Sequence, residues 1–155
     1  MEEIKRMQKY LLLIRRAVGW TAEEFGEQIG VTRQTINNIE SGRTNLTKTQ
    51  YIAMRSVLSA EINKNPKDTT MLADILEVFV DNPDDYTPDT RKVLLRKANI
   101  LAPSVINHTL TKKEIVSEWR DIILGLALIG IGAYSIASSK PSDSWLIKML
   151  SRNKD

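Results

Sequence analysis

The sequence of 155 residues predicts an all-α protein. Its apolar residues recur at alternating spacings of three and four, which is the period of an amphipathic helix. Threonines precede most of these segments, where a hydroxyl can cap a helix start, and glycines or prolines separate them. No stretch alternates between apolar and polar residues for long enough to form a sheet. We therefore expect an N-terminal helical bundle, additional helices and a long apolar C-terminal helix.

The expected bundle occupies residues 1–64. Its first helix carries one apolar stripe and ends at Gly19. The members of the stripe are Ile4, Met7, Leu11, Ile14 and Val18. Three further helices each begin at a threonine, and the second helix of the four ends at Gly30, because a left-handed glycine lets the chain turn into the next helix. The three threonine caps are Thr21, Thr32 and Thr47.

Two further regions follow the bundle. Residues 65–110 are expected to form a small helical connector or sensor region, with helices over about 69–80 and 87–101. Pro103 is expected to end or kink the second of these helices. Residues 111–155 are expected to open with a capping box and to form one long helix followed by a basic tail.

Composition places the chain among ordinary globular proteins, since 42% of its residues are hydrophobic and 26% are charged. It has no cysteine, which excludes disulfides, thiolate catalysis and cysteine-ligated zinc. Residues 1–64 carry ten Lys and Arg against seven Asp and Glu, a net charge of +3. The net charge is −2 for residues 65–110 (five against seven) and +2 for residues 111–155 (seven against five). A basic first third beside an acidic middle suits an N-terminal domain that faces nucleic acid.

The side chains that enzymes use are scarce. The only histidine, His108, lies between Asn107 and Thr109 and has no carboxylate within five residues of it. A surface histidine is the simpler interpretation. The sequence also lacks a phosphate-binding loop and metal-ligand spacings. We therefore expect no enzyme activity, no catalytic or metal site, no cofactor and no small-molecule substrate.

The third expected helix, over residues 32–41, has two distinct sides. At 100° per residue, Ile36 and Ile39 fall together and would dock on the first two helices. Four polar side chains share an arc of roughly 140° on the other side; they are Arg33, Gln34, Asn37 and Asn38. Arginine matches the paired acceptors of guanine, and asparagine or glutamine can pair with adenine. Two short capped helices joined through a glycine turn are the geometry that places the second helix in the major groove.

Residues 30–42 read Gly-Val-Thr-Arg-Gln-Thr-Ile-Asn-Asn-Ile-Glu-Ser-Gly. This segment resembles the core of the Xre/Cro-repressor helix-turn-helix family, and the resemblance extends over residues 4–62. It implies a lambda-repressor-like bundle in which Arg15 and Glu40 form a partly buried structural ion pair. It also implies that Arg33, Gln34 and Asn38 read bases or phosphates. Three further residues are placed near the DNA backbone by the same resemblance; they are Thr32, Arg43 and Asn45.

The chain departs from the family pattern at two positions of the second helix. Ala22 stands where the family usually has a glutamine that touches phosphate, which removes one expected DNA contact. Gly26 stands where the family usually has alanine at the tight helix crossing, and a glycine there costs about 0.5–1 kcal/mol of helix stability.

Together these features predict a sequence-specific transcription regulator, acting as a repressor and as a homodimer, that places helix 32–41 in the major groove of double-stranded DNA. The alternative is a membrane-linked protein-interaction adaptor that reuses the helix-turn-helix fold without binding DNA.

The apolar segment 122–139 leaves two interpretations open. Its eighteen residues carry no charge, and a membrane span needs about 20 apolar residues. Trp119 and Trp145 flank it as interface residues would, whereas a basic tail after the segment opposes a span from the cytoplasm. The other interpretation is a core helix that is hydrophobic all round and that mediates oligomerisation. We accordingly expect a cytoplasmic protein, either free or tethered to the inner face of the plasma membrane.

Overall fold

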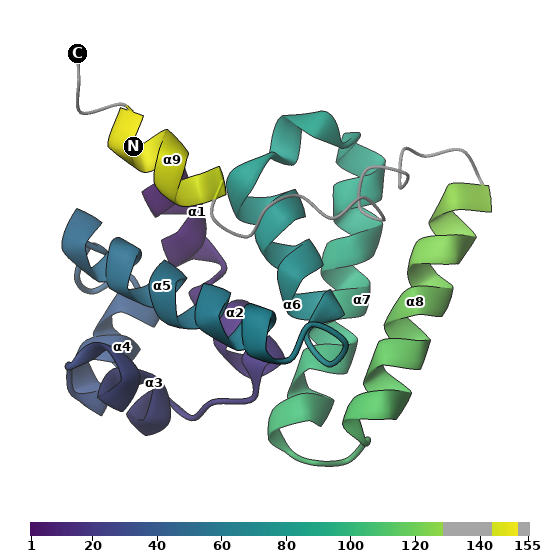
Figure 1. Cartoon of the computed structure of the whole chain (residues 1–155), viewed down its shortest axis with the longest axis horizontal. Coiled ribbons are helices and arrows are strands. Elements are labelled where there is room, and N and C mark those ends of the chain that lie inside the picture. Colours follow the sequence, from purple (N-terminus) through teal and green to yellow (C-terminus); the bar gives the residue numbers. More distant parts are fainter. Residues whose placement is uncertain (129–143, 152–155) are drawn as a thin grey trace.

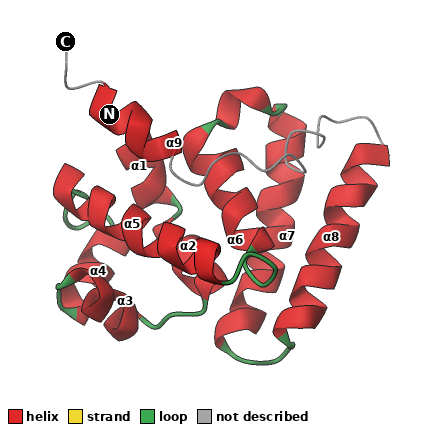
Figure 2. Cartoon of the chain, in the orientation of Figure 1, coloured by secondary structure: helices red, strands yellow, loops and turns green. Residues whose placement is uncertain are grey.

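The computed structural model describes residues 1–128 and 144–151, and the regular elements of these residues are all helical (Figures 1 and 2). The first five helices are α1 (Glu2–Lys9), α2 (Leu11–Val18), α3 (Ala22–Ile29), α4 (Arg33–Glu40) and α5 (Lys48–Lys64). They are followed by α6 (Thr70–Ile75), a π-helical turn η1 (Leu76–Asp81), a short 3-10 turn η2 (Pro83–Asp85), α7 (Pro88–Ile106), α8 (Lys112–Leu128) and α9 (Ser144–Ser151).

The first expected helix is divided in two at Tyr10. This residue has φ −105° and ψ 12°, outside helical values, although its N–H still donates to Arg6 and its carbonyl oxygen accepts from Ile14. The Tyr10 ring lies against the ring of Phe79, with centroids 5.2 Å apart. The packing of Tyr10 against η1 thus coincides with a break in the helix, although the apolar residues keep one helical period across it.

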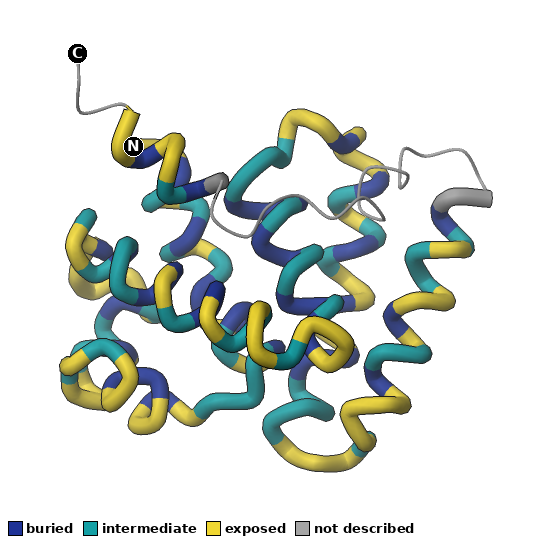
Figure 3. Tube along the Cα trace, viewed as in Figure 1, coloured by how far each residue is buried: buried dark blue, intermediate teal, exposed yellow. Residues whose placement is uncertain are grey.

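Helix α2 is buried on more than the one stripe that its sequence shows. Leu11 and Ile14 of the stripe are fully buried, and Leu13 and Ala17 beside them are buried as well. The reason is that α2 packs against α6 and α7 in addition to the other N-terminal helices. The helix therefore lies inside the molecule, between the N-terminal bundle and the helices that follow it (Figure 3).

A buried ion pair joins α5 to η1. The guanidinium of Arg55, which is 3% exposed, donates to both carboxylate oxygens of Asp81 at 2.6 and 2.9 Å and to the Tyr51 hydroxyl at 3.1 Å. Trp145 of α9 covers this pair, with its ring centroid 5.1 Å from the guanidinium carbon. The Trp145 indole also donates to Ser59 at 3.0 Å. Helix α9 is thereby attached to the polar side of α5.

Of the two expected middle helices, the first keeps its length and the second is longer. The helix predicted over 69–80 is α6 continued by η1, whose last turn widens to a π-helix. Helix α7 begins after the Thr87 cap, with Pro88 in its first turn, and runs through Pro103 to Ile106. The expected end at Pro103 is therefore wrong. An interior proline removes its own N–H donor and crowds the carbonyl oxygen four residues earlier, yet α7 continues past it, and the Pro103 carbonyl oxygen accepts from Asn107 at 2.9 Å.

The long apolar C-terminal helix expected from the sequence is also wrong. Helix α8 is amphipathic: Ile115, Trp119 and Leu126 are buried against the molecule. Charged residues between them, Glu118 and Arg120, are exposed. It packs beside α7 and α6 as the outer helix of a hairpin (Figure 1). In the part of the chain that the structure describes, no helix combines the length and apolar character that crossing a membrane requires.

Both tryptophans that were expected at a membrane interface contact protein instead. The indole N–H of Trp119 donates to Asp74 of α6 at 2.7 Å, and Trp145 is buried on α5. An indole ring needs apolar surroundings and one hydrogen-bond acceptor for its N–H. In a protein, neighbouring apolar side chains supply the surroundings, and a carboxylate or hydroxyl supplies the acceptor. The remainder of the expected apolar segment, residues 129–139, lies outside the described residues.

Candidate nucleic-acid interface

Helices α3 and α4 cross closely through a glycine-dependent turn. Thr21 and Thr32 cap the two helices by accepting from backbone N–H groups at 3.1 Å. Gly30 between them is left-handed, with φ +78°. A Cβ atom on Gly26 would lie 2.5 Å from the backbone oxygen of Val31, closer than any real contact. Glycine at this position therefore lets the turn lie directly against α3.

Helix α4 presents one polar side to the solvent. Ile36 and Ile39 are 0% and 1% exposed and attach the helix to the core. The predicted base-reading side chains lie opposite: Arg33, Gln34 and Asn37 are exposed, and Asn38 is half-buried. Gln34 Nε2 donates to the Asn38 side-chain oxygen at 3.0 Å. The two amides thus hold each other on the exposed side of the helix.

The loop after α4 carries the other two predicted DNA-backbone residues. The carbonyl oxygen of Asn38 accepts from the N–H groups of Arg43 and Thr44 at 2.9 and 3.3 Å. Gly42 makes the turn possible with φ +78°. Arg43 and Asn45 are exposed on this loop, and Thr32 is exposed at the opposite end of α4. All seven residues predicted to contact DNA therefore lie on α4 or directly beside it.

Gln8 of α1 holds the loop in place, a role that was not predicted from the sequence. Its amide nitrogen donates to the carbonyl oxygens of Ile39 at 3.0 Å and Thr44 at 2.7 Å. Its amide oxygen accepts from the N–H of Leu46 at 2.9 Å. Gln8 directly follows Met7 of the apolar stripe and is half-buried in the structure. A polar residue next to the stripe is the one feature of the sequence that could have indicated this role. One side chain thus connects α1 to the end of α4 and to the loop.

Arg15 and Glu40 connect α2 to the last residue of α4. Arg15 Nε and Nη2 donate to the two carboxylate oxygens of Glu40 at 2.6 and 3.1 Å. The side chains are 12% and 8% exposed. Arg15 also donates to the Trp20 carbonyl oxygen at 3.0 Å. The pair fixes the C-terminal end of α4 relative to the bundle and directs no charge toward the exposed side of α4.

Charge around the exposed side of α4 is mixed. Arg33 and Arg43 form no ion pair with any described residue. Glu23 and Glu27 of α3 are exposed and line a hollow of about 400 Å³ together with Arg33. Ala22, where the family has a phosphate-binding glutamine, is buried and offers no polar group. Cations are thus available at both ends of α4, whereas α3 presents carboxylates beside it.

Comparison with known protein families agrees with this geometry. Residues 11–63, which include α2 to α5 without the last residue, match a family model described as Helix-turn-helix. This family model is of the Xre and lambda-repressor-like type. The match covers 53 of 155 residues, about a third of the chain. No curated protein and no solved structure matches the chain.

The helix-turn-helix family consists of DNA-binding regulatory domains and is not a family of enzymes. The match therefore supports a DNA-binding transcription regulator of the Xre type, with double-stranded DNA as its partner. The matched residues contain α4, its caps and the loop that follows it.

Proposed function

We propose that this protein is a sequence-specific transcriptional repressor that reads double-stranded DNA with α4 in the major groove. The observation that carries the proposal is the exposed row of guanidinium and amide side chains on α4, opposite the buried isoleucines. An exposed helix without a partner usually carries Glu and Lys, whereas adjacent asparagines are poor helix formers. The presence of Asn37 and Asn38 on this side of α4 is explained if their side chains hydrogen-bond to base edges.

Each side chain has a distinct role in this proposal. Arg33, in the first turn of α4, would donate two hydrogen bonds to a guanine. The Gln34 and Asn38 amides, which already bond to each other, would present a prearranged pair of donors and acceptors to an adenine. Arg43 and Asn45 would contact phosphates and fix the register of α4 without reading sequence. The Gln8 side chain would fix the position of this loop relative to α4.

We further propose that the protein binds as a homodimer. One module of this size makes too few base contacts for useful specificity, and paired modules read two half-sites about one helical turn apart. Helix α5 and the region after residue 65 are the candidate dimer surfaces. Sedimentation equilibrium of the full chain with and without DNA tests this part of the proposal. A monomer that protects a single half-site would contradict it.

Fluorescence anisotropy with duplex DNA from the protein's own promoter region tests DNA reading. We expect Arg33→Ala to lose about 1–3 kcal/mol of discrimination between the site and a scrambled duplex. Arg43→Ala should weaken binding to both duplexes and lower the salt slope by about one. Lys97→Ala, an exposed cation on α7, is the matched control and should behave as the parent does. Absence of DNA binding would favour a protein-interaction adaptor and overturn the proposal. Full discrimination by Arg33→Ala would show that the placement of α4 in the major groove is wrong.

A further inference from the structure

A cavity lies where the helix-turn-helix segment meets the turn between α7 and α8. It has a volume of about 570 Å³, within the range of roughly 300–1,000 Å³ that small-molecule sites occupy. Its walls come from the end of α2, Trp20, the end of α5, the end of α7 and the first turn of α8. We call it the junction pocket. A smaller inner recess of about 30 Å³ adjoins it; the two share Val18, Glu61, Val105, Lys112 and Ile115.

The pocket has an apolar wall formed by branched side chains. Val18 and Val105 are half-buried, and Ile115 is 5% exposed. A Cβ atom on Gly19 would lie 3.0 Å from Val105, so α2 and α7 are already in close contact at this end of the pocket. A branched aliphatic group would be covered by this wall.

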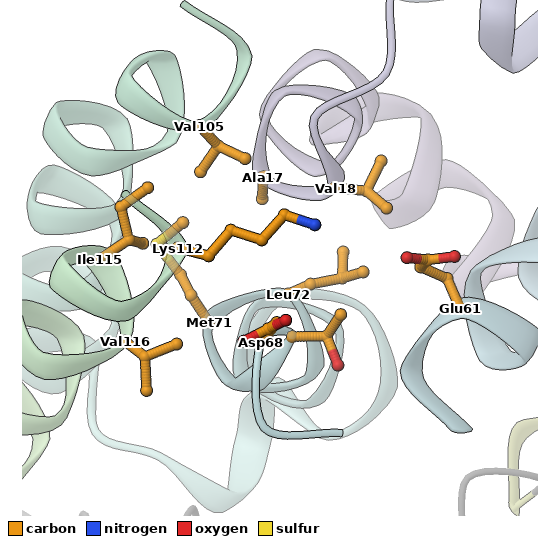
Figure 4. Close-up of a pocket in the computed structure, with 11 residues that line it drawn as sticks. Ala17, Val18, Glu61, Asp68, Met71, Leu72, Val105, Lys112, Ile115 and Val116 are labelled. Carbon is orange, nitrogen blue, oxygen red and sulfur yellow. The ribbon is translucent and has the colours of Figure 1, made fainter. Parts of the chain in front are cut away.

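Charges of both signs face the same space. The Lys112 side chain extends across the recess in the direction of Val18 and Glu61, and the carboxylates of Glu61 and Asp68 also border it (Figure 4). No carboxylate of the described residues lies within ion-pairing distance of the Lys112 ammonium. The Glu61 carboxylate accepts a hydrogen bond from Asn65 at 3.0 Å, which fixes its orientation. The junction pocket and its recess are therefore lined by one exposed lysine without an ion-pair partner among the described residues and by three carboxylates. These are Glu61, Asp68 of the recess and Glu114, which also caps α8 by accepting from the Thr111 N–H at 3.0 Å.

We infer that the junction pocket binds a small zwitterion with a branched apolar body, the chemistry of an aliphatic α-amino acid. A ligand carboxylate would pair with Lys112, a ligand ammonium with Glu61 and Asp68, and the aliphatic group would cover the apolar wall. A purely anionic ligand would meet the carboxylates, and a purely cationic one would meet the lysine. Only a molecule with both charges is attracted both by Lys112 and by the carboxylates.

The first test uses the unmodified full chain and three ligands of nearly equal shape. L-leucine carries both charges, 4-methylpentanoate lacks the ammonium, and 3-methylbutylamine lacks the carboxylate. In isothermal titration calorimetry we expect saturable binding of leucine with a Kd of about 1 mM or tighter. Each analogue should bind at least about tenfold more weakly, because it loses one charge-assisted contact. Absence of saturable leucine binding, or equal binding of either analogue, would overturn the inference.

The second test assigns the charges to their residues. Lys112→Met should abolish leucine binding, and Glu61→Gln should weaken it by about tenfold, since a neutral amide still accepts a hydrogen bond. Lys113→Met changes the neighbouring exposed lysine, which does not line the pocket, and should bind leucine as the parent does. Leucine binding that survives Lys112→Met would place the ligand elsewhere and overturn the inference. Both tests measure ligand binding alone, so their outcome does not depend on DNA binding.

Discussion

The side-chain amide of Gln8 donates to the carbonyl oxygen of Thr44 at 2.7 Å and so joins the first helix to the loop after α4. The same side chain bonds to Ile39 and Leu46, so its donor and acceptor are both used. Arg43 and Asn45, which we propose as phosphate contacts, lie on either side of Thr44. The position of these two residues relative to α4 thus depends on one glutamine more than thirty residues earlier in the sequence.

Gln8→Ala should loosen this loop. Loss of three hydrogen bonds, worth about 0.5–1.5 kcal/mol each, should lower the free energy of unfolding by about 1.5–4.5 kcal/mol. Amide hydrogen exchange at Leu46 should accelerate, because its N–H loses its acceptor. Gln28→Ala, on an exposed side of α3, is the matched control and should change neither quantity. A Leu46 amide that stays protected in Gln8→Ala would contradict the assigned role.

The Arg15–Glu40 pair should behave as a buried unit. Glu40→Ala leaves the guanidinium without its carboxylate in a site 12% exposed and should destabilise the protein by about 3–5 kcal/mol. Arg15→Met with Glu40→Leu removes both charges and should recover part of that loss, although the Trp20 carbonyl oxygen then loses its donor. Urea unfolding of the two single variants and the double variant gives the coupling energy. Additive losses would show that the two side chains do not stabilise each other.

Gly26→Ala should be destabilising although alanine favours helices. The added methyl would lie 2.5 Å from the Val31 carbonyl oxygen, a backbone atom that cannot move aside without changing the α3–α4 turn. We expect a loss of about 1–3 kcal/mol, larger than the roughly 1 kcal/mol that alanine contributes through propensity. Gly125→Ala on α8 has nothing within 4 Å of the added methyl and should instead stabilise the protein. If both variants gain stability in urea unfolding, the close crossing at Gly26 is wrong.

Local features of the fold could be predicted from the residues themselves, whereas the one long-range contact that was expected, Arg15–Glu40, came from the family resemblance. The threonine caps at Thr21, Thr32, Thr47 and Thr87 bond to N–H groups three residues away, so each pattern is contained in a few letters. The three hydrogen bonds of Gln8 span 31 to 38 residues. Such contacts depend on how helices pack, which the apolar period alone does not specify.

The difference between local and long-range contacts also explains which part of the candidate site could be predicted and why some predictions were wrong. The exposed row on α4 could be predicted because a single helix has a fixed 100° rotation per residue. The Arg55–Asp81 pair joins an acidic residue of the middle region to a basic residue of the first, and neither position carries a local signal. Segment 122–139 was expected to lie in a long apolar helix because its residues are uncharged. That window does not include Trp119, whose bond to Asp74 attaches one face of α8 to α6.

The carboxyl of Asp74 makes stability depend on pH. Burial is the main cause that raises its pKa from 3.8 to about 7; the Trp119 hydrogen bond lowers it, and the nearby Glu77 charge raises it. The folded protein therefore holds a proton on Asp74 more tightly than the unfolded chain does. Stability from this group is complete below about pH 4 and is lost as the pH rises through about 7. One pKa unit corresponds to about 1.4 kcal/mol, so the loss is on the order of a few kcal/mol.

Asp74→Asn removes this dependence, because the amide is neutral at every pH and its oxygen still accepts from the Trp119 indole. Urea unfolding at intervals from pH 5 to pH 8 should show the parent losing stability relative to Asp74→Asn as the pH rises, with the variant more stable at pH 8. Asp84→Asn changes an exposed carboxylate on η2 and should follow the parent throughout. A difference between parent and Asp74→Asn that stays constant from pH 5 to pH 8 would show that Asp74 does not titrate there.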